Sequence, residues 1–226
     1  MNNFRLALRT SALFAFTFLF VSGVSAQAPR TWVSGTGDDA HACSRFAPCR
    51  TFAGAIGKTA TGGEITAMDA GGFGAVTISK SITLDGTGVP SSITAPQATA
   101  IIINIPFRRQ GDTARTVRIR GLSINGLGKG INGINVIAAK IVTVEDCVID
   151  GFRQNGINVQ AGRLFVRNTT IRNNDGIGIN VTSESGAAIS DTTVVFNGTG
   201  LAGAVVKYCC VVLYGNRNGD PPPPAP

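Results

Sequence analysis

Short alternations of apolar and polar residues recur along the second half of the chain, about 22 to 25 residues apart. Three stretches share the pattern: 117–136, 142–159 and 164–181. The most distinctive part of each is Gly-Ile-Asn-Val, which occurs at 133–136, 156–159 and 178–181. A fourth, weaker copy follows, with Ile189 and Val194 in register. A fixed period of this length predicts one structural unit stacked on itself.

Each copy contains three alternations of about four residues, rich in Ile and Val, of the kind that forms a strand with one buried face. Residues that tolerate a left-handed backbone separate the first two alternations, at Gly121, Asp146, Asn168 and Asp191. A similar column follows the second alternation, at Gly126, Gly151 and Asn173. Three strands and three corners per period predict one coil of an all-β parallel β-helix. Helical repeats do not fit, since no copy contains a run of about ten residues with apolar positions three and four apart.

Stacked coils bring equivalent residues about 4.8 Å apart. One outward column alternates in charge, and it reads Arg120, Glu145, Arg167 and Ser190. A second outward column reads Asn125, Asp150, Arg172 and Val195. Because unlike charges stabilise such a stack, Glu145 and Asp150 are interpreted as ladder partners rather than catalytic acids. Cys147 shares an inward column with Leu122, which makes it a buried thiol rather than a reactive one.

Residues 1–26 have the features of an export signal. Arg5 and Arg9 give a positive start, the stretch 12–24 is largely apolar, and a small-residue cleavage site ends at Ala26. We expect cleavage near Ala26 and a secreted or periplasmic mature protein, in a compartment where disulfides persist. No later stretch is expected to span a bilayer.

Three segments follow the signal: an N-terminal loop and capping helix over 27–61, the β-helix over 62–214, and a Pro-rich flexible tail over 215–226. The open apolar end of a stacked-repeat protein needs a cover. Residues 51–58 suit a short helix for this purpose, with Phe52, Ala55 and Ile56 on one face. Gly62-Gly63-Glu64 then leads into the first strand.

The chain has five cysteines. We expect a disulfide between Cys43 and Cys49, since a metal site there would have only His41 as a further ligand. Cys209 and Cys210 are adjacent, and their pairing is open between a local disulfide and a bond to another chain. The odd total leaves at least one thiol unpaired.

Several segments match a known type of protein: Gly62-Gly63-Glu64-Ile65, Gly-Gly-Phe-Gly-Ala-Val-Thr-Ile at 71–78, Ser-Lys-Ser-Ile-Thr-Leu-Asp-Gly at 79–86, and the three Gly-Ile-Asn-Val segments. On these residues the chain, over about 30–206, resembles secreted right-handed single-stranded parallel β-helix proteins of the pectin-lyase-like superfamily. The segments 31–35 and 48–52 resemble bacterial proteins of this fold whose activity is uncharacterised. The resemblance implies the right-handed winding but no reaction, because one fold hosts many functions.

The resemblance also implies what an enzyme of this type would need. Lyases of the superfamily typically hold calcium with acidic residues and use an arginine as base, whereas hydrolases use clustered aspartates beside the scissile bond. By resemblance, Gly-Ile-Asn-Val is the cleft strand, and its outward residues include no carboxylate. The charged residues that remain as catalytic candidates are Arg118, Arg120, Glu145, Asp150 and Asp175. Asp175 follows two asparagines after a strand and is favoured as a corner residue.

The net charge is +7, and loss of Arg5 and Arg9 with the signal leaves +5. Arginines concentrate in the segment 106–115, which includes Arg108 and Arg109. Such charge suits uronic-acid polymers or anionic envelope material, although ordinary solvation explains it as well. Nucleic acid is a poorer partner, because the chain is exported and its arginines lack interleaved aromatic residues.

We therefore expect an exported, non-catalytic protein that binds acidic glycan or envelope material through its outer strand face, without a cofactor. The expected contacts are Asn135, Asn158, Asn180, Gln160, Thr182, Arg108 and Arg109. A competing interpretation is that the stacked amides only stabilise the coils. The alternative function is a polysaccharide lyase or glycoside hydrolase acting on uronic-acid polymers, with Ca²⁺ as cofactor if it is a lyase.

Overall fold

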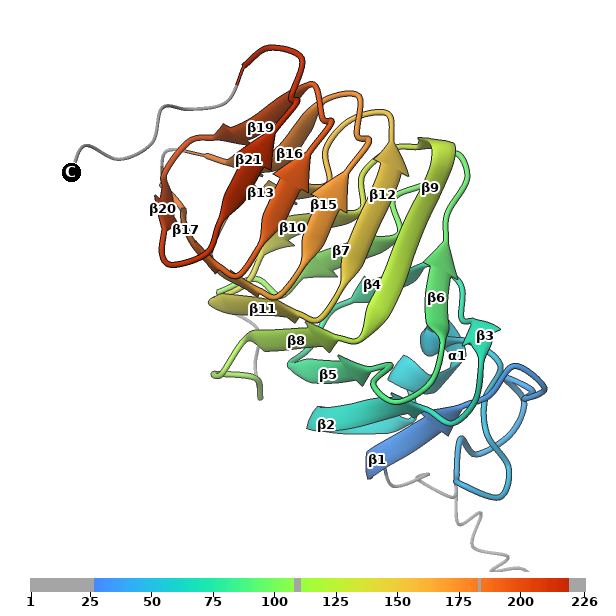
Figure 1. Cartoon of the computed structure of the whole chain (residues 1–226). Coiled ribbons are helices and arrows are strands. Elements are labelled where there is room, and N and C mark those ends of the chain that lie inside the picture. Colours follow the sequence, from blue (N-terminus) through green and yellow to red (C-terminus); the bar gives the residue numbers. More distant parts are fainter. Residues whose placement is uncertain (1–26, 108–110, 183, 220–226) are drawn as a thin grey trace, which may run out of the picture.

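The computed structural model describes residues 27–107, 111–182 and 184–219. Within them the chain winds through three parallel sheets, and from β2 onward each full turn adds one strand to each sheet (Figure 1). Sheet A contains, in spatial order, β1 (Ala28–Val33), β2 (Thr59–Ala67), β5 (Ile82–Asp85), β8 (Thr116–Arg120), β11 (Ile141–Glu145), β14 (Arg163–Arg167), β17 (Gly186–Ser190) and β20 (Val205–Lys207).

Sheet B contains β3 (Gly71–Gly72), β6 (Ser91–Thr94), β9 (Leu122–Gly130), β12 (Val148–Phe152), β15 (Thr170–Arg172), β18 (Thr193–Val195) and β21 (Val212–Tyr214). Sheet C contains β4 (Val76–Ile78), β7 (Ile101–Asn104), β10 (Ile134–Ala138), β13 (Ile157–Val159), β16 (Ile177–Val181) and β19 (Thr199–Ala202). The predicted all-β parallel β-helix is confirmed.

Columns of aliphatic side chains line the inside of the stack. Sheet A aligns Ile119, Val144, Val166 and Ile189. Sheet B aligns Ile124, Ile149, Ile171 and Val194. The Gly-Ile-Asn-Val segments align in sheet C, with Ile134, Ile157 and Ile179 in the core. All these residues are buried, and because burial of one such side chain stabilises by about 1.5–3 kcal/mol, the columns hold neighbouring coils together.

The corners from sheet A to sheet B have the predicted backbone. Gly121, Asp146, Asn168 and Asp191 have positive φ values between 46° and 67°, in the left-handed region. Because each coil turns sharply at the equivalent residue, successive coils stay in the same register.

The second predicted corner column is correct only in part. Gly151 and Asn173 have φ values of 74° and 54°, but Gly126 is not left-handed. Strand β9 continues to Gly130, and its positive φ values fall at Leu127 and Gly128 instead. The bend of this coil is therefore displaced toward the C-terminal end of its strand.

The predicted organisation of residues 27–61 as loop and capping helix differs from the structure at both ends. Strand β1 already pairs in parallel with β2, with Arg30 beside Glu64, and β2 begins at Thr59. The missed strand buries Thr31, whose hydroxyl lies 2.8 Å from that of Thr59, at a position where later coils bury aliphatic residues. Because a polar residue stands at this inward position, the alternation of apolar and polar residues that marks a strand cannot be recognised in the sequence.

The expected short helix is α1 (Phe52–Ile56), with Thr51 as its N-cap accepting a hydrogen bond from the Gly54 N–H at 2.9 Å. Phe52 is fully buried and packs edge-on against Phe73, with 5.4 Å between ring centroids. The helix lies beside the first strands (Figure 1). It therefore covers apolar surface at the N-terminal end of the stack.

The cysteines separate into three environments. The predicted Cys43–Cys49 disulfide is confirmed, and both residues are buried. Cys147 is a buried free thiol, as predicted, and burial raises its pKa to about 12. Cys209 and Cys210 form a disulfide with each other.

Two predicted segments fall outside the described residues: the signal at 1–26 and the prolines of the tail at 220–226. Across the described ranges no helix has the length and hydropathy needed to cross a membrane.

Candidate functional site

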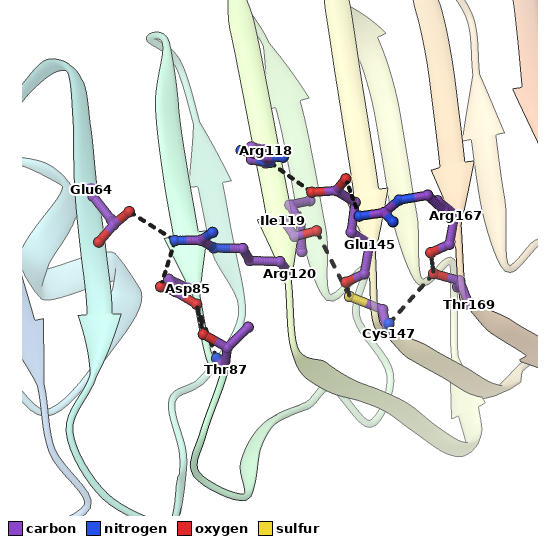
Figure 2. A network of polar contacts seen from close by, with 10 residues as sticks. All are labelled: Glu64, Asp85, Thr87, Arg118, Ile119, Arg120, Glu145, Cys147, Arg167 and Thr169. Atoms are coloured by element: carbon purple, nitrogen blue, oxygen red, sulfur yellow. Dashed lines mark hydrogen bonds and ion pairs between the residues drawn. The ribbon is translucent and has the colours of Figure 1, made fainter.

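The outer face of sheet A brings together charged side chains from five coils (Figure 2). Side chains alternate inward and outward along a strand, so Arg118 and Arg120 of β8 both point outward. Stacking adds residues from the neighbouring strands of the same sheet. The resulting group, called the charged face below, consists of Glu64, Asp85, Arg118, Arg120, Glu145 and Arg167.

Glu145 lies between two arginines. Arg118 donates from Nε to one carboxylate oxygen at 2.7 Å, and Arg167 donates from Nη2 to the other at 3.2 Å. The Glu145 side chain is only 10% exposed, whereas those of Arg118 and Arg167 are 49% and 59% exposed. The hydrogen bond from Arg118 and the second one from Arg167 outweigh burial and lower the pKa of Glu145. This carboxylate is therefore held ionised.

Arg120 joins the other two carboxylates. Its Nη2 lies 2.8 Å from Asp85 and 3.2 Å from Glu64. Burial of Asp85 opposes its ionisation, but hydrogen bonds from Thr87 together with Arg120 outweigh burial and lower its pKa. The Nε atom of Arg120 is buried and has no hydrogen-bond partner among the described residues, so carboxylates at the Nη2 end orient this guanidinium.

The pairing pattern limits the chemistry of the charged face. A general acid for glycoside hydrolysis needs a raised pKa and a proton to give. Glu145 and Asp85 have lowered pKa values instead, and each is bonded to arginine. The arginines retain donors, because a guanidinium has five N–H groups and Arg118 and Arg167 each use one in these bonds.

Shallow hollows follow the outer face of sheet A. One, of about 570 Å³, is lined by Lys140, Arg163 and Phe165 among others. A second, about 300 Å³, shares Phe165 and adds Arg167 and Tyr208. A third, about 270 Å³, lies beside Arg118 over β5 and β8. The first two share lining residues and the third lies on the same sheet, so the hollows form a row of separate depressions across the coils. Phe165 is 44% exposed and lines both of the first two.

The five catalytic candidates that the sequence suggested lie in different parts of the structure. Arg118, Arg120 and Glu145 lie on the charged face. Asp150 lies on sheet B and accepts hydrogen bonds from Arg172 at 3.2 Å and Asn173 at 3.0 Å. Asp175 lies after β15 and approaches Arg217 at 3.4 Å. The last two therefore belong to separate structural pairs rather than to one constellation.

The charge ladder is correct in register but differs in its contacts. Arg120, Glu145 and Arg167 do align in one column, yet Glu145 bonds to Arg118 and Arg167. Arg120 turns toward Asp85, which precedes it in the same column. The repeat pattern starts after Asp85 in the sequence, so sequence reasoning missed this residue.

The outward amides of sheet C are bonded largely to one another. Asn158 donates to Asn135 at 2.9 Å, and Asn180 donates to Asn158 at 2.8 Å. Gln160 also donates to Asn135, at 3.3 Å, and the Thr182 hydroxyl donates to the Gln160 carbonyl at 2.8 Å. These bonds agree with the interpretation of stacked amides as stabilisers, and ligand contacts at these residues stay a prediction.

Arg108 and Arg109, the other expected ligand contacts, lie outside the described residues. A further hollow, about 420 Å³, lies over β4 and β7 beside α1 rather than along the amide column. Sequence reasoning missed Phe165 as a candidate because an outward aromatic residue breaks the column of polar residues and carries no charge signal. No group of three or more His, Cys, Asp or Glu in the described part of the chain could hold a metal ion.

Comparisons with known proteins agree with this architecture. A family model described as "Right handed beta helix region" matches residues 108–218. The crystal structure of pectate lyase Pel9A superposes with a TM-score of 0.53 at 14% sequence identity, covering 77% of this chain and 56% of the lyase chain. This chain thus spans little more than half the length of that enzyme. Comparison with curated protein sequences gives no significant match.

These observations define the class of protein: a right-handed parallel β-helix. More particularly, its fold resembles that of pectate lyase Pel9A over 77% of the chain. At 14% identity the likeness concerns the fold, and the activity has to be argued from the site.

Proposed function

We propose that this chain is a non-catalytic, exported protein that binds an acidic polysaccharide along the outer face of sheet A. The observation that carries the proposal is the pair of half-exposed arginines, Arg118 and Arg167, that flank the ionised Glu145. Glu145 fixes both guanidinium groups in position, so little side-chain entropy is lost when they bind a ligand.

Guanidinium groups are suited to the carboxylates of uronic acids. Arginine binds a carboxylate through parallel N–H donors and keeps its charge at any physiological pH. Neighbouring coils repeat about every 4.8 Å, and β8 and β14 are two coils apart, so a polymer lying across the coils meets Arg118 and Arg167 on either side of Glu145.

The hollows supply apolar contact as well as charge. Phe165 is exposed beside Arg167, and Lys140 and Arg163 together outweigh the single negative charge of Glu184 in the lining of the hollow of about 570 Å³. The ring can pack against the C–H face of a sugar while the cations attract its carboxylate.

A lyase or hydrolase fits the charged face less well. Calcium binding requires carboxylate oxygens that are free to coordinate, but Glu64, Asp85 and Glu145 are each paired with arginine. The lowered pKa values of Asp85 and Glu145 also remove them as proton donors near neutral pH. The alternative function expected from the sequence, a polysaccharide lyase or glycoside hydrolase, is therefore tested as one outcome of the binding experiment.

The test measures binding of polygalacturonate and alginate by calorimetry and affinity electrophoresis, with neutral dextran as the reference polymer. We expect binding of the acidic polymers that weakens with salt. The variant Arg167→Gln should weaken it several-fold and Arg118→Gln/Arg167→Gln at least about tenfold, a loss of about 1.4 kcal/mol. Arg172→Gln is the matched control, since Arg172 makes a similar half-exposed pair with Asp150 on sheet B.

Two outcomes oppose the proposal. Equal binding by the double variant and Arg172→Gln would place the ligand elsewhere, for example on the amides of sheet C. Appearance of unsaturated or reducing ends during incubation, with or without Ca²⁺, would make the protein an enzyme.

A further inference from the structure

The second disulfide of the chain differs from the first in its exposure. Cys209 and Cys210 lie between β20 and β21 in the last coil, and both are exposed within the part of the chain that the structure describes. Cys43 and Cys49 are fully buried. A thiolate reaches a disulfide sulfur only where the sulfur is accessible, so the two disulfides differ in reactivity under native conditions.

Cys210 occupies the corner between sheets A and B. In three earlier coils the corner residue donates its N–H to the carbonyl that precedes the next corner: Gly121 to Glu145, Asp146 to Arg167 and Asn168 to Ser190. Asp191 continues the series by donating to the Cys209 carbonyl at 3.0 Å. Cys210 therefore follows Gly121, Asp146, Asn168 and Asp191 in the corner column.

The backbone of Cys210 has the left-handed conformation of that column, with φ of 64°. Glycine adopts it freely and Asn or Asp tolerate it, but other residues lose roughly 1–2 kcal/mol there. A ring closed between adjacent cysteines restricts the backbone of both residues. The disulfide thus holds at this corner a left-handed conformation that Gly, Asp and Asn adopt at lower cost in the coils below.

Hydrogen bonds on both sides of the disulfide attach the last coil to the coil below. Tyr208 donates to the Ile189 carbonyl at 2.8 Å, and Val212 donates to the Thr192 carbonyl at 3.0 Å. Both bonds depend on the path that the chain takes through Cys209 and Cys210. Loss of the ring therefore loosens β20 and β21 together.

We propose that Cys209–Cys210 is a thiol-exchange site whose reduction releases the last coil from the stack. A dithiol reductant attacks one sulfur, the S–S bond breaks, and a mixed disulfide forms. The second thiol of the reductant then displaces the protein thiol. Both cysteines finish as thiols, and the reductant leaves as its own disulfide, having supplied two electrons and two protons.

The first experiment treats the folded full chain with dithiothreitol, quenches by alkylation and locates the modified cysteines by mass spectrometry. We expect Cys209 and Cys210 to be alkylated at least about tenfold faster than Cys43 and Cys49, because reactivity follows access. Buried Cys147 serves as an internal reference for unfolding. Equal rates for both disulfides, or modification only together with Cys147, would overturn the proposal.

The second experiment measures amide hydrogen exchange. Reduction, or the variant Cys209→Ser/Cys210→Ser, should lower protection of the Tyr208, Val212 and Asp191 amides while the Asn168 amide stays protected. The variant Cys209→Ser/Cys210→Asn should restore protection without a disulfide, since asparagine tolerates the left-handed corner. Reduction without loss of protection, or failure of the Cys209→Ser/Cys210→Asn variant to restore it, would show that the ring does not hold the coil through its corner.

Discussion

Glu145 lies between arginines that come from two different coils. Its carboxylate accepts from Arg118 and Arg167, and these bonds lower its pKa below the ordinary 4.5. A carboxylate with a lowered folded-state pKa stabilises the fold at pH values above its unfolded pKa. That stability is lost as pH falls through the folded pKa, which lies below 4.5.

The variant Glu145→Gln should therefore be less stable than the parent protein at neutral pH, by about 1–2 kcal/mol. The difference should shrink as the pH falls below 4.5. Urea unfolding followed by circular dichroism across this pH range measures it. Asp150→Asn is the matched control, because its partner Arg172 is half exposed and such pairs contribute about 0–1 kcal/mol. A pH-independent difference would show that Glu145 acts through packing rather than charge.

At the scale of the element, a buried asparagine series supports the corners between sheets B and C. Asn174 donates to the Asn197 side chain at 2.8 Å, and Asn197 donates to Asn216 at 3.0 Å. The same NH2 group, which has two hydrogens to share, also lies 3.1 Å from the Ile171 and Val195 carbonyl oxygens. A buried amide with this many partners connects three successive coils.

Replacement of Asn197 by alanine should destabilise the protein by about 3 kcal/mol, because backbone and amide groups are left buried without partners. Asn180→Ala removes one of the outward amides of sheet C, which lies half-buried, and should cost about 1 kcal/mol. Chemical unfolding of the two variants compares inner and outer amides directly. Equal losses would contradict the role of the buried series.

The strands differ in how far they could be predicted from the sequence. The coils from β8 to β18 could be predicted, because their inward positions hold mostly Ile or Val at a nearly constant period and their corners hold Gly, Asp or Asn. Strand β1 could not, because buried Thr31 replaces the aliphatic signal. For the site, the sequence identified Arg118, Arg120 and Glu145 but grouped them with two carboxylates from elsewhere. Which charged groups pair depends on how far each side chain reaches toward the neighbouring columns. The period of the sequence carries no information about that reach.

At the scale of the whole molecule, a stack of coils is held by contacts between nearest neighbours, so its ends should be less stable than its middle. The difference between middle and end can be measured in one core column of sheet C, whose residues have similar neighbours. It aligns Ile157, Ile179 and Leu201, of which the first two are fully buried and Leu201, in the terminal strand β19 of the sheet, is half-buried.

Ile157→Ala should destabilise the protein by about 3–4 kcal/mol, since the cavity it leaves is enclosed by coils on both sides. Leu201→Ala should cost only about 1 kcal/mol, because its place is already open on one side. Hydrogen exchange should follow the same gradient, with the slowest amides in β10, β13 and β16 and faster exchange in β19 and β20. Equal losses from the two substitutions, with uniform exchange along the stack, would mean that the coils unfold as one unit and that the last coil is as firmly held as the centre.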